Sequence, residues 1–184
     1  MTCKICKYDF CWICLGPWSD HGQTTGGFYK CNRFDAGKVD EKSTDAQKAK
    51  LELDRYLFYY QRFIEHDRSL KFAAGNREVA EHRMVEMQEA GKSAWIEVQF
   101  LKQAVEQVID CRRVLKYTYV LGYFLMDGTQ EKSLFEHHQE MLEKHTEMLH
   151  HYTEMKLEEM DRTQVINLTR VAEKFMASLL SSLE

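Results

Sequence analysis

Proline and long apolar runs are nearly absent from this chain. Pro17 is the single proline among 184 residues, and beyond residue 44 no residue of this helix-breaking type occurs. No apolar stretch approaches the roughly 18 residues that a membrane-spanning helix requires, and no charged and then apolar signal pattern opens the chain. The sequence therefore favours long, unbroken helices and gives no reason to expect a membrane as a partner.

The chain also lacks a strong excess of either charge. Its 25 Lys and Arg residues against 29 Asp and Glu residues leave a formal net charge of −4. Electrostatic capture of nucleic acid or of an anionic membrane requires positive charge, so we expect neither partner. The apolar fraction of 44% is ordinary for a folded protein, and the length allows one or two small domains with a core.

Cysteine is scarce except in the first 31 residues, and only Cys111 lies outside that segment. The segment reads C-x2-C-x4-C-x2-C-x6-H-x9-C, and its candidate metal ligands are Cys3, Cys6, Cys11, Cys14, His21 and Cys31. Gaps of two residues let both sulfurs of a knuckle face one tetrahedral zinc ion, so disulfide pairing or ordinary burial is the weaker interpretation. A zinc-type cysteine set suits a reducing compartment, the cytosol or the nucleus.

The spacing assigns the two cysteine pairs to different ions. Only four residues separate Cys6 from Cys11, whereas a four-cysteine site usually spaces its knuckles by about a dozen residues or more. The later ligands form a complete set of four: Cys11, Cys14, His21 and Cys31. Cys3 and Cys6 form half of another set, whose remaining ligands would precede residue 1. We therefore expect the chain to be a truncated part of a longer protein.

Apolar residues recur at three- and four-residue steps through most of the remaining sequence, as in amphipathic helices. A first stripe predicts a helix over roughly residues 45–72, and consists of Leu53, Leu57, Tyr60, Phe63, Ile64 and Leu70. A weaker helical segment follows around residues 78–89, with Gly75 and Gly91 as its expected ends.

Three further helices are predicted downstream. Ser93 is a good N-cap for the first of these, and Asp127-Gly128 ends it. Its apolar period is kept by Trp95, Val98, Leu101, Val105, Val108, Arg112, Leu115 and Tyr119.

A similar period marks residues 134–152, and a capping box of Asp161 and Gln164 opens a last helix that continues to Leu183. Four or five helices of this length, joined by short turns, predict a mainly α fold built as a long-helix bundle. A small zinc-binding module precedes it, and the polar stretch 35–46 serves as the linker between them.

Several blocks of sequence resemble one family. The segment FCWICLGPW from Phe10 to Trp18, with the neighbouring Met1-Thr2-Cys3, His21-Gly22 and Cys31-Asn32-Arg33, resembles the end of the catalytic RING in RING-between-RING ubiquitin ligases. Other blocks look like the helical domain of the Ariadne subfamily: Arg55 to Tyr59, Ser69-Leu70, Trp95 to Lys102 (WIEVQFLK) and Tyr117 to Tyr119. The resemblance covers nearly the whole chain and weakens after about residue 155. It divides the chain into a truncated, RING-like zinc module, residues 1–34, and an Ariadne domain, residues 35–184.

The resemblance implies transthiolation. In this family, ubiquitin passes from a conjugating enzyme to a cysteine of the catalytic RING, and from there to a substrate protein. The nucleophile belongs to a Gly-Cys-Asn-His segment that would precede Met1, so this chain holds no catalytic residue and is expected to be inactive alone. Cys111 falls in a helical stripe and is not a candidate nucleophile. The alternative is a non-catalytic regulatory or decoy protein that binds partners of the ubiquitin cascade.

The family's helical domain also implies a lid. It folds over the catalytic RING until a partner, typically a neddylated cullin–RING ligase, draws it away. The positions that match the family's inhibitory contacts are Phe72, Glu136 and Glu147. Without the resemblance, Phe72 is equally well interpreted as a core residue near a helix end. The two glutamates would then be ordinary solvated carboxylates. The glutamates are eleven residues apart, about three helical turns, and so share one face.

The ligand count predicts the zinc stoichiometry. We expect one tightly held zinc per chain on the complete set, because two thiolates alone leave half of a tetrahedral site open. Elemental analysis of the purified, desalted protein measures the ratio. Two tightly bound zinc ions per chain would contradict the assignment of Cys3 and Cys6 to an incomplete site.

Overall fold

Four long helices make up most of the computed structural model, which describes residues 3, 5–11, 16–21, 34, 44–89, 95–156 and 159–183. The helices are α1 (Asp45–Glu89), α2 (Trp95–Phe124), α3 (Gln130–Glu154) and α4 (Arg162–Ser181), and a short 3-10 helix, η1 (Trp18–His21), precedes them. The prediction of a mainly α fold is confirmed. In the part of the chain that the structure describes, no helix combines the length and apolarity needed to span a bilayer.

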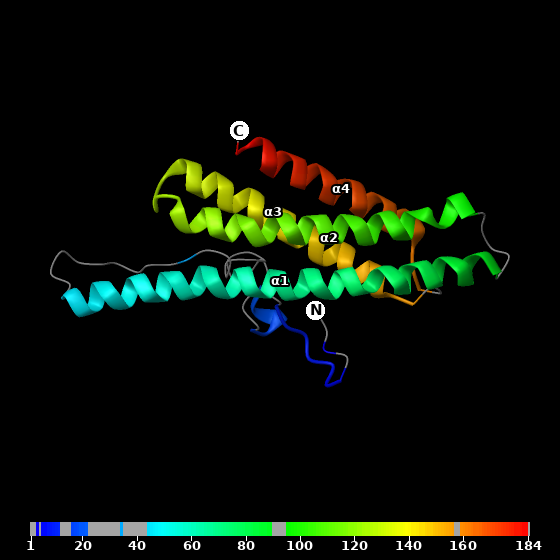
Figure 1. Cartoon of the computed structure of the whole chain (residues 1–184), viewed down its shortest axis with the longest axis horizontal. Helices are drawn as coiled ribbons and strands as arrows, with labels where there is room; N and C mark the ends of the chain where they lie inside the picture. The colour runs from blue at the N-terminus through cyan, green and yellow to red at the C-terminus, as the bar shows by residue number, and fades with distance from the viewer. Residues whose placement is uncertain are drawn as a thin grey trace.

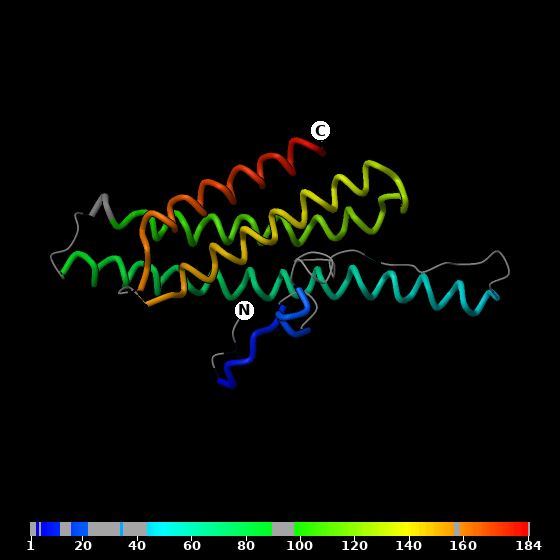
Figure 2. The backbone as a smooth tube through the Cα atoms, turned by 180° about the vertical axis from the view of Figure 1, so that it is seen from behind, coloured from blue at the N-terminus to red at the C-terminus, as the bar shows by residue number. Residues whose placement is uncertain are grey.

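The helices pack as an elongated bundle with α2 at its centre. Figure 1 shows α1 and α2 side by side and antiparallel, α3 crossing them, and α4 on the side of the bundle away from α1. The described N-terminal residues lie beside α1, also in the reverse view of Figure 2. Ion pairs at successive levels fix the register of α1 against α2: Asp67–Lys116, Arg77–Glu106 and Glu81–Lys102.

The apolar core surrounds α2, whose inward positions are fully buried. Leu101, Val108 and Leu115 have at most 1% of their surface exposed. The other helices contribute Ala73, Ala80, Met84, Leu142, Leu149, Val165, Leu168, Ala172 and Leu179. Each buried aliphatic side chain contributes about 1.5–3 kcal/mol relative to exposure, so this core supplies much of the stabilisation of the bundle.

Two of the predicted helix boundaries are confirmed. The Asp161 carboxylate accepts hydrogen bonds from the backbone N–H groups of Thr163 and Gln164, at 2.8 and 3.2 Å, and so caps α4. The Asp127-Gly128 stop follows the end of α2, and Gly128 adopts a φ of 77° that L-residues rarely reach. The predicted N-cap at Ser93 lies outside the described residues.

The predicted break at Gly75 is wrong, because α1 continues through it to Glu89. An isolated glycine weakens a helix by only about 1 kcal/mol. Contacts on both sides of Gly75 outweigh that loss: Ala73 and Ala80 are buried in the core, and Arg77 is paired with Glu106 of α2 at 2.7 Å.

The predicted helix over residues 45–72 is confirmed as part of α1, but its apolar stripe is only partly buried. Leu53, Leu57 and Tyr60 are each about half exposed, whereas Leu70 packs against the core. This part of α1 buries a largely polar face instead, which consists of Tyr59, Arg62, Glu65, His66 and Ser69. Aromatic residues of α1 and α2, both exposed and buried, line an apolar cavity of about 290 Å³.

Substituting Gly75 tests the continuity of α1. Because Gly75 lies inside a helix and a Cβ there would meet nothing within 4 Å, Gly75→Ala should raise the free energy of unfolding by about 0.5–1 kcal/mol. Urea unfolding followed by circular dichroism measures the change. The matched control, Gly128→Ala, should destabilise because of its positive φ. A destabilising Gly75→Ala would contradict the continuous helix.

Candidate functional site

Cys3 opens a tight turn that favours its thiolate form. The backbone N–H groups of Cys6 and Ile5 and the Cys6 side chain hydrogen-bond the Cys3 sulfur, and these bonds lower the pKa of the Cys3 thiol. Hydrogen bonds from Lys7 N to Cys3 O (2.9 Å) and from Cys3 N to Tyr8 O (2.8 Å) close the turn, with Lys7 at a φ of 61°. A chain that donates N–H groups to a cysteine sulfur suits a metal knuckle.

The second pair begins at Cys11, which precedes η1. Cys11 N donates to Gly16 O at 2.9 Å, and Phe10 and Pro17 form an antiparallel bridge that leads into η1. His21 is buried, and its Nδ1 lies 3.0 Å from the Pro17 carbonyl oxygen. Because a carbonyl only accepts, this bond places the proton on Nδ1 and the lone pair on Nε2, the form in which an imidazole binds zinc.

The full ligand set reaches beyond the described residues. Cys14 and Cys31 lie outside them, and among the residues that the structure describes, no three His, Cys, Asp or Glu side chains gather as a metal site. Cys3, Cys6, Cys11 and His21 are the candidate ligands that the structure describes. Their donors, thiolates and a neutral imidazole, fit zinc.

The candidate lid residues Phe72 and Glu147 share a cluster between α1, α2 and α3. Phe72 lies in the middle of α1, so its predicted place near a helix end is wrong; its side chain is 43% exposed and its ring centroid is 5.8 Å from that of His150. Arg112 of α2, which is fully buried, places Nη2 2.8 Å from Glu147 Oε1 and 3.5 Å from His150 Nδ1. Arg112 therefore connects both candidate residues.

The prediction that Glu147 is an ordinary solvated carboxylate is wrong. Only 12% of its side chain is exposed. Burial, the largest single influence, raises the pKa of this carboxyl, but the charges of Arg112 and His150 together with the Arg112 hydrogen bond outweigh it, so the pKa is lowered. Glu136 lies on the same helix and is half-buried.

A second buried polar group lies about one helical turn away. Glu143 Oε1 is 3.0 Å from His66 Nε2 and also accepts a hydrogen bond from the Tyr119 hydroxyl. Glu143 and Tyr119 have no exposed surface, and His66 has 1%. Together with the Arg112–Glu147 pair, these groups form a polar layer inside the bundle, which the predicted apolar stripes did not reveal. The one signal for this polar layer in the sequence was Arg112, which occupies a position in the predicted apolar stripe that begins at Trp95.

Comparison with known proteins places this chain in a family. The sequence pattern of the Ariadne domain matches residues 54–184. The chain belongs to the Ariadne domain family. The predicted resemblance is thereby confirmed for the helical part.

The curated relatives are longer proteins. The chain is 38% identical over 188 residues to the probable E3 ubiquitin-protein ligase rbrA of Dictyostelium discoideum, covering 96% of this chain and 36% of the relative. It is 43% identical over 145 residues to the E3 ubiquitin-protein ligase dbl4 of Schizosaccharomyces pombe, covering 77% and 27%. Identity to the E3 ubiquitin-protein ligase ariadne-1 of Drosophila melanogaster is 43% over 144 residues, covering 77% and 28%. The chain thus spans about a third of their length.

Removing the Glu147 charge should destabilise the bundle, because it leaves Arg112 buried without its counter-charge. We expect Glu147→Gln to lower the free energy of unfolding by about 3 kcal/mol at neutral pH. Because the folded-state pKa is lowered, the contribution of Glu147 is present above the pKa of the unfolded state. It is lost as the pH falls through the lower, folded-state pKa.

Urea titrations between pH 3 and 7 measure both effects. Glu78→Gln is the matched control, since Glu78 is exposed on α1, and it should change stability by at most about 0.5 kcal/mol. An equal effect of the two substitutions would show that the Arg112–Glu147 pair is not energetically coupled.

Proposed function

We propose that this chain is the C-terminal part of a RING-between-RING ubiquitin ligase, in which the helical bundle regulates the catalytic RING. The observation that carries the proposal is the Ariadne-domain match over residues 54–184, together with relatives that are named E3 ubiquitin-protein ligases. In the whole protein, ubiquitin would pass from a conjugating enzyme through a cysteine thioester to substrate proteins.

The N-terminal segment would serve as a zinc-stabilised part of the catalytic RING. Cys11, Cys14, His21 and Cys31 would hold one ion, and Cys3 and Cys6 would supply half of a second site. The hydrogen bonds to the Cys3 sulfur and the His21–Pro17 bond support this assignment. Zinc would supply structural order here, because it replaces the hydrophobic core that so small a segment lacks.

We propose no residue of this chain as the nucleophile that forms the thioester. Thioester formation requires an accessible thiolate of lowered pKa. Cys111 has no exposed surface, and burial is the main cause that raises the pKa of its thiol. Its role is to pack in the core beside Gln107, whose amide donates to its sulfur at 3.3 Å.

The bundle would act as an autoinhibitory lid. Phe72 presents an exposed aromatic ring on the side of α1 that meets α3, and the neighbouring Arg112 holds Glu147 in one position. An exposed ring beside an ordered polar cluster suits a specific, reversible contact. A neddylated cullin–RING ligase would release it, and the cytosol or the nucleus would be the site of action.

The lid is tested by adding the whole chain to Drosophila ariadne-1 from which the helical domain has been removed. We expect slower ubiquitin transfer in a single-turnover assay, because the bundle covers the catalytic RING. Phe72→Ala and Glu136→Lys should weaken this inhibition by about tenfold in half-maximal concentration, the loss of a contact worth about 1.4 kcal/mol.

Phe124→Ala is the matched control, since Phe124 is 74% exposed but lies at the end of α2. Glu147 is left intact in this assay because its removal also perturbs the core. Inhibition that is unaffected by both surface substitutions would contradict the lid surface, and a chain that does not inhibit at all would contradict the lid.

A further inference from the structure

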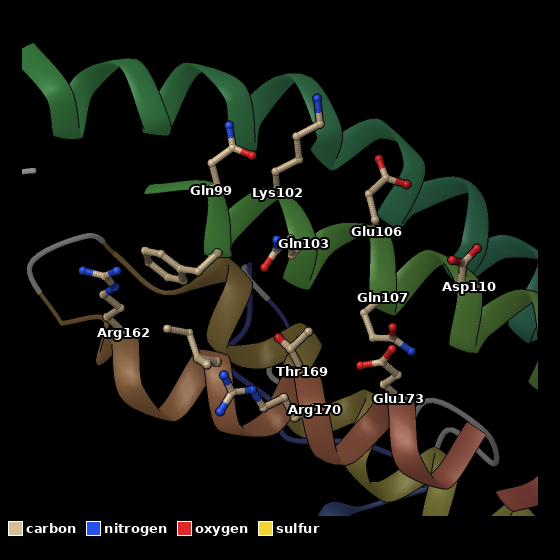
Figure 3. Close-up of a pocket in the computed structure, with 12 residues that line it drawn as sticks. Gln99, Lys102, Gln103, Glu106, Gln107, Asp110, Arg162, Thr169, Arg170 and Glu173 are labelled. Atoms are coloured by element: carbon tan, nitrogen blue, oxygen red, sulfur yellow. The ribbon is translucent and has the colours of Figure 1, made fainter. Parts of the chain in front are cut away.

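A groove between α2 and α4 has no role in the function proposed above. It encloses a volume of about 1020 Å³. Phe100 and Ile166 contribute apolar surface, and the remaining lining is polar. Figure 3 shows Gln107 of α2 and Glu173 of α4 directed toward the space between the two helices, whereas Lys102 and Glu106 point toward α1. The groove lies away from the described N-terminal residues, which pack beside α1 (Figure 1).

Glutamines at four-residue steps line the α2 wall. The Gln107 amide is already engaged, since it donates to the sulfur atoms of Cys111 and Met176 at 3.3 and 3.9 Å. Gln99 and Gln103, called here the glutamine row, lie about 6 Å apart along the groove. An extended peptide presents equivalent backbone groups every two residues, about 6.7 Å apart. Each carboxamide has donors and an acceptor, the two capacities that a peptide backbone also has. The row therefore matches the edge of an extended chain.

Three charged side chains of α4 remain available for a ligand. Lys102 and Glu106 of the α2 wall are already paired with Glu81 and Arg77 of α1. By contrast, among the residues that the structure describes, Arg162, Arg170 and Glu173 form no ion pair; Arg162 stacks over the Phe100 ring at 5.7 Å. Figure 3 shows the two arginines toward one end of the groove and Glu173 toward the other.

The spacing of these charges defines the complementary ligand. Arg162 and Arg170 are eight residues apart on one helix, which separates them by about 12 Å. In an extended peptide, side chains at i and i+4 lie on one face about 13 Å apart. Two acidic residues at that spacing can pair with both arginines, and a basic residue two positions further on lies near Glu173.

We propose that the α2–α4 groove binds an extended segment of a partner protein with the pattern acidic-x-x-x-acidic-x-basic. The glutamine row binds the peptide backbone, whatever its sequence, and the α4 charges select the side chains. Peptide binding in the groove requires neither zinc nor the lid contact. A failure of the proposed function would therefore leave this proposal unaffected, and the reverse also holds.

Fluorescence anisotropy with the full chain and labelled peptides tests the groove. The probe is a ten-residue peptide containing Glu-Ser-Thr-Ser-Glu-Thr-Lys, and its partner has every charge reversed. We expect the first peptide to bind about tenfold more tightly than the reversed one at about 0.1 M salt, since each exposed ion pair contributes up to about fivefold. Equal binding of the two peptides, or no binding of either, would overturn the proposal.

A charge swap then locates the site. Arg170→Glu should weaken binding of the first peptide about fivefold, and replacing the second peptide glutamate by lysine should restore it. The double variant Gln99→Ala/Gln103→Ala should weaken both peptides to the same degree, because it removes backbone contacts. Arg68→Glu and Gln61→Ala, at exposed positions of α1, are the matched controls and should change nothing.

The melting temperature of each variant, followed by circular dichroism, establishes that the bundle is intact. A swap that fails to restore binding, or an α1 control that weakens binding as much as Arg170→Glu, would place the peptide elsewhere and overturn the assignment of the groove.

Discussion

The ion pair between Arg112 and Glu147 is the constraint on which much of this bundle depends. A guanidinium with no exposed surface is tolerable only beside a counter-charge, because the transfer of an unpaired charge out of water costs several kcal/mol. Since the pair joins α2 to α3, it fixes which turns of these helices face each other. The His66–Glu143–Tyr119 group extends the same requirement to α1. The polar layer thus specifies the alignment of three helices, whereas the apolar side chains around it supply most of the stabilisation.

This arrangement gives the candidate lid surface a particular physical character. Phe72 is exposed, but its ring rests against His150, which in turn lies 3.5 Å from Arg112. A substitution at Glu147 therefore acts on the interior as well as on the surface. The effects of Phe72 and Glu136 substitutions report surface contact more directly, because Phe72 is 43% exposed and Glu136 is only half-buried.

The sequence carried enough information for the fold class and for several boundaries. The period of α2 and the cap at Asp161 are local features, and local features survive folding. Other features depend on distant residues. Whether α1 breaks at Gly75 is decided by the burial of Ala73 and Ala80 together with the Arg77–Glu106 pair. Whether Leu53 is core is decided by which face of α1 is covered by α2. The ligand set remains a prediction from spacing, supported at Cys3 and His21 by hydrogen bonds that no spacing rule contains.

The candidate lid surface and the groove both depend on α2, which raises the question of whether they are coupled. Coupling requires an element with two arrangements that both ligands bias differently. Along its length α2 buries Val98, Leu101, Val108 and Leu115 almost completely, and dense packing of this kind resists small displacements. The groove uses the side of α2 that faces α4, whereas Arg112 acts toward α3. The close packing of α2 therefore favours additive effects of the two surfaces, so that a peptide in the groove leaves the lid contact at its original strength.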